Sequence, residues 1–368
     1  MSDYRWVPAF ALLLVSLPGH LYAQEPVAWR DPSPHTVQFV TVDNNVKLEV
    51  LDWGGSGRAL VLMAGLGDTA HVFDDFAPKL TSQYHVYGIT RRGFGDSSKP
   101  TSGYSGDQLG DDVVAVVDAL KLDRPVLVGH SRAGEELSSV GSRHPEKVAG
   151  LIYLDAAYFY AFYDPSVGAL QIDLYDLQSK LDRLKGNGQT DTRFVQGLLD
   201  EDLPRFEKDL RGLQEDIAAI PPGPAPTAAD RASVAAYSSW IDRIEGVHIP
   251  EAEIRQMFDV APDGSVGKGR NAPVGGALRE GTPKYTKIGV PVLAIYAIPD
   301  DLPYYADPVV RSAAEARDAA SKEAMAKAFE RGVPTARVVR VPHASHFVFL
   351  SNGADVLREM RAFLAGLH

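Results

Sequence analysis

The stretch from Arg124 to Asp155, RPVLVGHSRAGEELSSVGSRHPEKVAGLIYLD, constrains the fold more than any other. A run of branched apolar residues ends at Gly129, and a helical pattern begins at about Ala133. Ser131 therefore falls at a sharp turn between a buried strand and a helix. The helix is followed at once by a second short apolar run. Short apolar strands that alternate with helices are typical of a parallel sheet covered on both faces, which predicts an α/β fold.

The same alternation extends in both directions along the chain. Two strands around the turn at Asn44-Asn45 are expected at the start. The other expected strands lie in RALVLM, YHVYGI, RPVLVG, KVAGLIYL, GVPVLAIYA and ARVVRV, and the other expected helices cover about 109–120, 133–143, 308–331 and 354 onward. This order indicates one doubly wound sheet rather than several small domains.

The alternation stops between residues 158 and 287, where no convincing core strand occurs. Helical periodicity is present at 170–184, 203–220 and 234–244, and the proline-rich 221–226 and glycine-rich 262–276 are expected to be loops. The sequence thus predicts a helical insertion at 158–287 between two parts of a core, at 37–157 and 288–368.

The first residues are predicted to be a targeting segment. Arg5 precedes an apolar run at 7–17, and Ala23 offers a small residue at a plausible cleavage point. Residues 1–23 are predicted to be a signal peptide and 24–36 a linker, so that the mature chain starts at about Gln24. The apolar run is too short to span a membrane. We expect a secreted or periplasmic protein without a membrane anchor after the signal is removed.

Composition narrows the possible partners and chemistries. The chain has no cysteine, which excludes disulfides, thiolate metal sites and cysteine nucleophiles. The formal net charge is −11 and no dense Lys/Arg cluster occurs, so nucleic acid and anionic membranes are poor partners. No phosphate-binding glycine motif follows the first strand. We expect a small-molecule substrate and no cofactor or metal; the oligomeric state stays open.

Ser131 is predicted to be a nucleophile. A serine at such a turn points out of the sheet edge beside a helix N-terminus, and the turn needs small residues two positions away on each side, here Gly129 and Ala133. A serine hydroxyl needs a base to react at neutral pH. In open sheets of this kind the partners follow in the order serine, acid, histidine.

The expected base is His346, in the loop after the last strand, with His343 as its rival. The pair is not interpreted as a metal site, because no carboxylate-rich third ligand accompanies it. The orienting acid is expected after the PVLAIYA strand, where Asp300 and Asp301 both qualify. Asp155, after LIYLD, is a third candidate, although a carboxylate that caps its own turn is the favoured interpretation there.

Two backbone N–H groups are expected to form an oxyanion hole, that of Arg132 and that of Leu66 in the turn AGLGD. The Arg132 side chain has two interpretations. It forms a local ion pair with Glu135 or Glu136, which is favoured, or it recognises an acidic or carbonyl group of the substrate.

From about Val37 to its end the chain resembles the α/β-hydrolase superfamily, of the kind with a helical cap. The motifs that carry the resemblance are AGLGDTAHVF, RRGFGDSS, GHSRAG, PVLAIYAIPDD and HASHF, although the first motif usually begins His-Gly and here has Ala64. The resemblance implies a mostly parallel central sheet covered by helices. It also implies Ser131 as nucleophile, His346 as base and Asp300 as acid, with Asp301 as the alternative acid.

The resemblance also favours one reaction. Epoxide hydrolases and haloalkane dehalogenases of this family carry aspartate at the position of Ser131, and proline iminopeptidases carry a different glycine motif. A carboxylic-ester or lactone hydrolase is therefore expected. The alternatives are an amide or peptide hydrolase, a carbon–carbon bond hydrolase and, remotely, a non-catalytic binding protein. Tyr158, Phe159 and Tyr304 are expected at the substrate pocket, where packing of the cap on the core explains them equally well.

Overall fold

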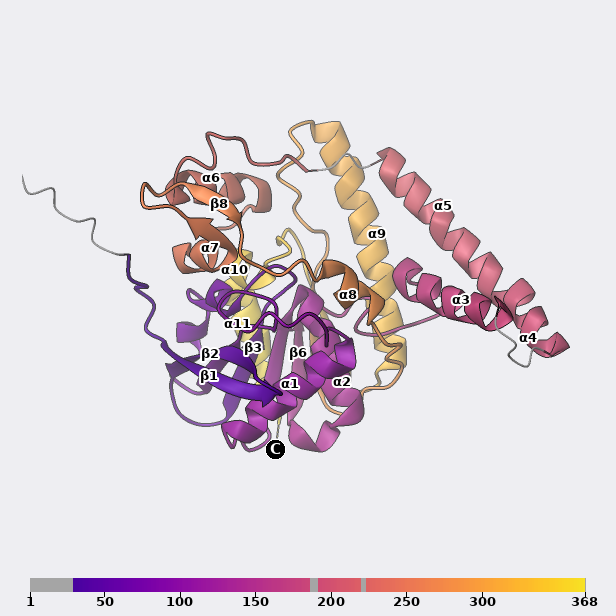
Figure 1. The fold of residues 1–368 in the computed structure, drawn as a ribbon, viewed down its shortest axis with the longest axis horizontal. Coiled ribbons are helices and arrows are strands. Elements are labelled where there is room, and N and C mark those ends of the chain that lie inside the picture. Colours follow the sequence, from indigo (N-terminus) through magenta and orange to yellow (C-terminus); the bar gives the residue numbers. More distant parts are fainter. Residues whose placement is uncertain (1–28, 186–190, 220–222, 368) are drawn as a thin grey trace, which may run out of the picture. The chain divides into compact units, whose positions relative to one another are not determined.

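An eight-stranded, mostly parallel sheet forms the centre of the structure, with the strand order β1-β2-β4-β3-β5-β6-β9-β10. The computed structural model describes residues 29–185, 191–219 and 223–367 (Figure 1). Residues 32–368 form one unit, which the following account concerns. The predicted signal peptide, 1–23, and the first part of the predicted linker lie outside the described residues.

Only one edge of the sheet is antiparallel. β2 pairs antiparallel with both β1 and β4, and every other pair is parallel. The eight strands are β1 Thr36–Asp43, β2 Val46–Gly54, β3 Ala59–Met63, β4 His85–Ile89, β5 Val126–His130, β6 Gly150–Leu154, β9 Val292–Ala297 and β10 Ala336–Val341. The predicted α/β-hydrolase architecture of the core is confirmed.

Helices cover both faces because consecutive strand residues point to opposite sides. In β5, Val126 and Val128 belong to the apolar cluster beneath η1 (Ala70–Phe73) and α11 (Gly353–Ala365). Leu127 belongs to the opposite cluster, with α1, α2 and α9. These three helices span Gly106–Ala119, Gly134–Arg143 and Pro308–Gly332, and the short α10, Val348–Ser351, precedes α11.

The predicted insertion lies between β6 and β9 and is mostly helical. Its helices are α3 Leu170–Lys185, α4 Thr192–Gly197, α5 Leu203–Ala219, α6 Val234–Glu245, α7 Glu251–Met257 and α8 Gly275–Glu280, and a π-helical turn at Leu198–Asp202 joins α4 to α5. Figure 1 shows α6 and α7 beside the small hairpin that contains β8, whereas α3 packs against α5 and α8.

One part of the insertion was predicted wrongly. Residues 262–276, expected to be a loop, contain the strand β8 (Val266–Gly269), which pairs antiparallel with β7 (Phe258–Val260), and the start of α8. The many glycines of this stretch favoured the prediction of a loop. The strand was missed because a small two-stranded ribbon lacks the buried apolar run by which core strands are recognised. None of the described helices is long and apolar enough to cross a membrane.

The start of α2 packs very closely on the end of β6. A Cβ at Gly134 would lie 2.0 Å from the carbonyl oxygen of Ala156, a backbone atom that cannot move aside. By contrast, Gly212 in α5 faces open space. We therefore predict that Gly134→Ala destabilises the protein by about 1–3 kcal/mol through overpacking, while Gly212→Ala stabilises it by about 0.5–1 kcal/mol through helix propensity.

Urea unfolding followed by circular dichroism measures both changes. Equal midpoints for the Gly134→Ala variant and the parent would show that the helix can move away from the sheet at no cost, contrary to this packing.

Candidate active site

Ser131 adopts the strained backbone expected of a strand-to-helix elbow. It follows β5 directly, its φ is 49°, and α2 begins three residues later. Residues other than glycine rarely adopt this left-handed conformation. A Cβ at Gly129 would lie 3.0 Å from the Leu137 side chain and 3.1 Å from the Ala133 Cβ, so the turn requires the small residues seen in the sequence.

Three side chains from different parts of the chain form a continuous hydrogen-bonded line. His346 Nε2 lies 2.8 Å from Ser131 Oγ, and His346 Nδ1 lies 2.7 Å from Asp155 Oδ2. His346 comes from the loop between β10 and α10, and Asp155 directly follows β6. The structure therefore brings Ser131 and His346 together as the sequence predicted, with a carboxylate on the far side of the imidazole.

That carboxylate is not the one that the resemblance implied. Asp300 does not bond His346; its Oδ2 accepts a hydrogen bond from Lys322 Nζ at 2.7 Å. Asp301 is exposed and lies 3.6 Å from His343, which is exposed as well. The assignment of the acid to Asp300, or to Asp301, is thus corrected to Asp155 on geometric grounds.

The backbone explains why Asp155 reaches the histidine. Its φ of 45° turns the side chain along the sheet edge. Asp155 Oδ1 accepts a hydrogen bond from the Ala297 N–H of β9 at 2.9 Å, which fixes the carboxylate so that Oδ2 faces His346. The turn-capping role favoured from sequence is not what these hydrogen bonds show, because Asp155 Oδ1 bonds the neighbouring strand β9 and Oδ2 faces His346.

Lys322 of α9 supplies the positive charge for this buried acidic corner. Its Nζ donates to Asp155 at 3.1 Å and to Asp300 at 2.7 Å, and it lies 3.3 Å from Asp318. Burial favours the neutral form of Asp155, but Lys322 and the His346 hydrogen bond outweigh it and hold the pKa well below its usual range. At Asp300 burial prevails, and it raises the pKa to about 6.

The two histidines of the site have opposite pKa shifts. Burial lowers the pKa of His346, but the hydrogen bond and the charge of Asp155 reverse this, so that the net shift is upward. Burial also lowers the pKa of His130, with the charge of His346 acting in the same direction, to about 3. The neutral His130 donates through Nε2 to the His346 carbonyl at 3.0 Å and so holds the loop that carries the base.

Arg132 and Leu66, the predicted oxyanion-hole residues, both lie next to Ser131. Arg132 is the following residue of the elbow, and Leu66 lines the same cavity as Ser131. The roles of their N–H groups stay a prediction. The Arg132 side chain is buried away from the cavity, where it bonds Glu135 at 2.7 Å and the Leu278 carbonyl at 2.8 Å. This matches the favoured interpretation of a local ion pair.

A cavity of about 350 Å³ opens above Ser131 and His346. Its walls are mostly apolar. The residues that line it are Leu66, Asp68, His130, Ser131, Tyr237, Trp240, Ile241, Ile244, Glu245, Ile249, Met257, His346 and Phe347. Helix α6 supplies the largest share of the wall.

The three residues predicted for the pocket do not line this cavity. Tyr158 is half-buried, and its ring lies 6.4 Å from that of His346 and nearly parallel to it. Phe159 packs edge-on against Tyr160, and Tyr304 packs against Tyr305. The interpretation as cap-to-core packing, which the sequence left equally open, fits Tyr158 and Phe159.

The sequence contained a signal for the true wall. Tyr237, Ile241 and Ile244 recur at helical spacing in the predicted helix 234–244. Such a stripe predicts a buried face but does not say whether that face packs on the core or borders a cavity.

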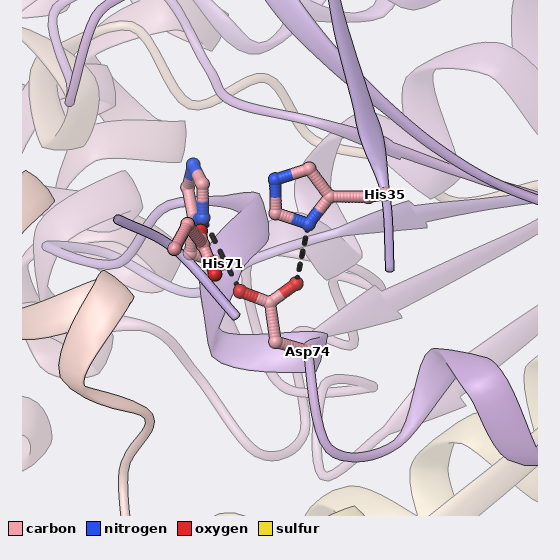
Figure 2. A group of neighbouring side chains, drawn as sticks. His35, His71 and Asp74 are labelled. Atoms are coloured by element: carbon pink, nitrogen blue, oxygen red, sulfur yellow. Dashed lines mark hydrogen bonds and ion pairs between the residues drawn. The ribbon is translucent and has the colours of Figure 1, made fainter. Parts of the chain in front are cut away.

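A second group of histidines and a carboxylate lies elsewhere, between η1 and the segment before β1 (Figure 2). Asp74 Oδ1 accepts hydrogen bonds from Ser33, His35 and Trp53, and its Oδ2 accepts one from His71. Burial favours the neutral carboxyl, but His35 and His71 hold the pKa of Asp74 at about 2. Four donors occupy this carboxylate, so the group forms an anchor for the start of β1.

A larger open hollow, of about 530 Å³, lies at the opposite end of the strands, where Ala59 and His85 begin β3 and β4. The hydrogen-bonded side chains of Ser131, His346 and Asp155 lie at the other end, where the strands finish. Ligand sites in parallel sheets lie at the carboxyl ends of the strands, which favours the smaller cavity.

A comparison with family models supports the fold. The model described as the alpha/beta hydrolase fold matches residues 58–353, a range that contains Ser131, Asp155 and His346. The chain belongs to the α/β-hydrolase family.

Similar proteins agree on the family but differ in their reactions. The chain is 34% identical over 116 residues to a fluoroacetate dehalogenase of Burkholderia sp., and 26% identical over 101 residues to a 2-(acetamidomethylene)succinate hydrolase of Mesorhizobium japonicum. These matches cover 30% and 27% of this chain and 38% and 36% of the relatives.

A solved structure of E-2-(acetamidomethylene)succinate hydrolase superposes with a TM-score of 0.56 at 17% identity, covering 90% of this chain and all of that one. At this identity the likeness shows the fold alone. The matched lengths and identities leave the substrate open.

The raised pKa of His346 depends on Asp155, which gives a prediction about the titration of this histidine. In Asp155→Asn the hydrogen-bonded negative charge is lost and burial remains, so the pKa of His346 falls below about 6.5, the ordinary value for histidine. Asp301→Asn, which removes an exposed carboxylate near His343, leaves the pKa of His346 unchanged.

NMR titration of the imidazole nitrogens, assigned with His346→Gln, measures both variants. If removing Asp155 left the titration of His346 unchanged, Asp155 would not be its electrostatic partner.

Proposed function

We propose that this chain is a serine hydrolase of carboxylic esters or lactones that works through an acyl-enzyme. The observation that carries the proposal is the line Ser131–His346–Asp155, with contacts of 2.8 and 2.7 Å, at the base of a cavity with apolar walls. A nucleophile, a base within hydrogen-bond reach and a group that orients the base are the parts that acyl transfer needs.

In the first half-reaction Ser131 Oγ attacks the ester carbonyl carbon while His346 Nε2 takes the hydroxyl proton. The carbonyl oxygen becomes an oxyanion, which the N–H groups of Leu66 and Arg132 would stabilise. His346 then gives its proton to the leaving alcohol oxygen as the carbon–oxygen bond breaks, which leaves the acyl group on Ser131.

In the second half-reaction water attacks the acyl-enzyme. His346 takes a proton from the water and returns it to Ser131 Oγ as the acid product leaves. Asp155 stays ionised throughout, holds the Nδ1–H tautomer and stabilises the imidazolium that forms twice in each cycle.

The nucleophile argues against halide removal, despite the similarity to a dehalogenase. A carboxylate that displaces a halide forms an ester, which water can cleave. Ser131 would form an ether, which His346 and water cannot hydrolyse. Amide and carbon–carbon substrates remain compatible with the same triad, and esters are preferred because alcohol is the better leaving group.

Export is proposed on a separate basis, the pattern of residues 1–23. An exported hydrolase meets small esters or lactones from outside the cell, which agrees with a cavity of this size.

The first activity prediction concerns p-nitrophenyl esters of increasing acyl length. Ser131→Ala loses turnover, and Asp155→Asn lowers kcat by about 10³- to 10⁴-fold because the imidazole loses its tautomer and orientation. Asp300→Asn, which leaves the His346–Asp155 contact in place, has a much smaller effect. Equal losses in the Asp155 and Asp300 variants would contradict the assignment of the acid, and full activity in Ser131→Ala would contradict the mechanism.

The second prediction concerns pH. His346 acts only when neutral, so kcat/KM for a neutral ester falls as pH drops through its pKa, which Asp155 holds above 6.5. Rates from pH 5 to 9, with ester stability controlled in Ser131→Ala, give the inflection. A profile flat down to pH 5 would show that another group is the base.

A further inference from the structure

Two carboxylates face the cavity above Ser131. Asp68 comes from the turn after β3, and Glu245 is the last residue of α6. An ideal Cβ at Gly65 would lie 3.1 Å from Asp68 Oδ2 and 3.1 Å from the Ser131 Cβ, so the Asp68 carboxylate and the nucleophile flank the same point. A carboxyl group therefore stands directly beside the place of reaction.

No lysine or arginine is among the described residues that line the cavity. The guanidinium of Arg91, whose charge acts on Asp68, is bound to Glu136 and to the carbonyls of Ala64 and Gly65. Behind Asp68 lies another buried acid, Glu253, whose carboxylate accepts hydrogen bonds from the N–H and hydroxyl of Thr69. Among the described lining residues only His130 and His346 can carry a positive charge, and the low pKa of His130, about 3, leaves His346 as the one that does so near neutral pH.

The pKa values of Asp68 and Glu245 reflect this lack of positive charge. Burial raises the pKa of Asp68 to about 7 in spite of His346, and the nearby Glu245 adds to the rise. Burial likewise raises the pKa of Glu245. A cation that enters the cavity would replace the missing countercharge and favour both ionised forms.

The remaining wall suits a cation with an apolar body. Tyr237 and Trp240 pack together with ring centroids 5.1 Å apart, and both line the cavity with Ile241, Ile244 and Met257. Aromatic faces attract ammonium groups, most strongly where water is excluded, as in sites that recognise quaternary ammonium ligands.

We propose that the preferred substrate is an ester whose acyl or alcohol part carries an amine or quaternary ammonium group, recognised by Asp68, Glu245 and the Tyr237–Trp240 wall. This inference rests on the proposed ester hydrolysis and names its substrate class. The proposal also predicts that anionic esters are poor substrates. The Arg132 side chain is bound within the core, so nothing in the cavity favours an anionic ester.

Two matched pairs of esters test the proposal. One pair varies the acyl group, with p-nitrophenyl 4-(trimethylammonio)butanoate against its uncharged isostere, p-nitrophenyl 5,5-dimethylhexanoate. The other varies the alcohol, with butyrylcholine against 3,3-dimethylbutyl butyrate. Because the members of each pair have nearly the same shape, the ratio of their kcat/KM values reports the charge preference alone. We expect a ratio of at least about 10 in one pair.

Variants assign the preference to residues. Asp68→Asn and Glu245→Gln each reduce the ratio several-fold, since each removes one of the two charges. The matched control is Asp242→Asn, which removes a carboxylate of the same helix that is exposed and lies 3.4 Å from His248. It leaves the ratio unchanged. For each variant, kcat/KM for the charged ester is divided by kcat/KM for its neutral isostere. A general loss of activity lowers both values and cancels in the ratio.

The pH dependence of the ratio gives an independent measurement. The protonation of His346 affects both members of a pair and cancels, whereas Asp68 attracts a cation only when ionised. The ratio therefore rises as pH increases through about 7 in the parent, and Asp68→Asn removes the contribution of Asp68 to this rise and leaves only that of Glu245.

Ratios near 1 in both pairs, or ratios unaffected by Asp68→Asn and Glu245→Gln, would overturn the inference while leaving ester hydrolysis intact. Absence of turnover of the neutral esters, with no labelling of Ser131 by a phosphonate probe, would instead count against the proposed function itself.

Discussion

The buried charge cluster around Lys322 is the interaction on which the site depends. Three carboxylates, Asp155, Asp300 and Asp318, surround one ammonium, and a single cation compensates them only in part. Removing the lysine would leave the buried carboxylates without their cation, and breaking a buried ion pair in this way costs about 3–5 kcal/mol. Asp155 follows β6, Asp300 follows β9, and both Lys322 and Asp318 belong to α9. The same contacts therefore hold these elements together and keep Asp155 ionised beside His346.

The elbow was predictable from sequence because it is decided locally. The left-handed backbone at Ser131 and the close contacts around Gly129 and Ala133 involve residues within one turn of the chain, so the pattern and the structure carry the same information. His346 was predictable for a related reason, since the loop after the last parallel strand opens at the same sheet edge as the elbow.

The choice between Asp155 and Asp300 was not predictable in this way. β6 and β9 are neighbours in register, with Leu154 opposite Ile295, so acids that follow either strand arrive at the same edge. Which of them contacts His346 depends on the φ of Asp155, on the Ala297 N–H and on a lysine that is distant in sequence. The cavity wall was missed for a similar reason: the apolar stripe of α6 predicts burial but not that part of the burial faces a substrate space.

The proximity of the two acids has a consequence for the imidazole. One ligand atom each of Asp155, Asp300 and His346 lies within 4.8 Å of the others, and both carboxylates share one lysine. The charge of Asp300 also raises the pKa of His346, although the two side chains make no hydrogen bond. The protonation of the imidazole is therefore a property of the whole cluster and not of the contact with Asp155 alone.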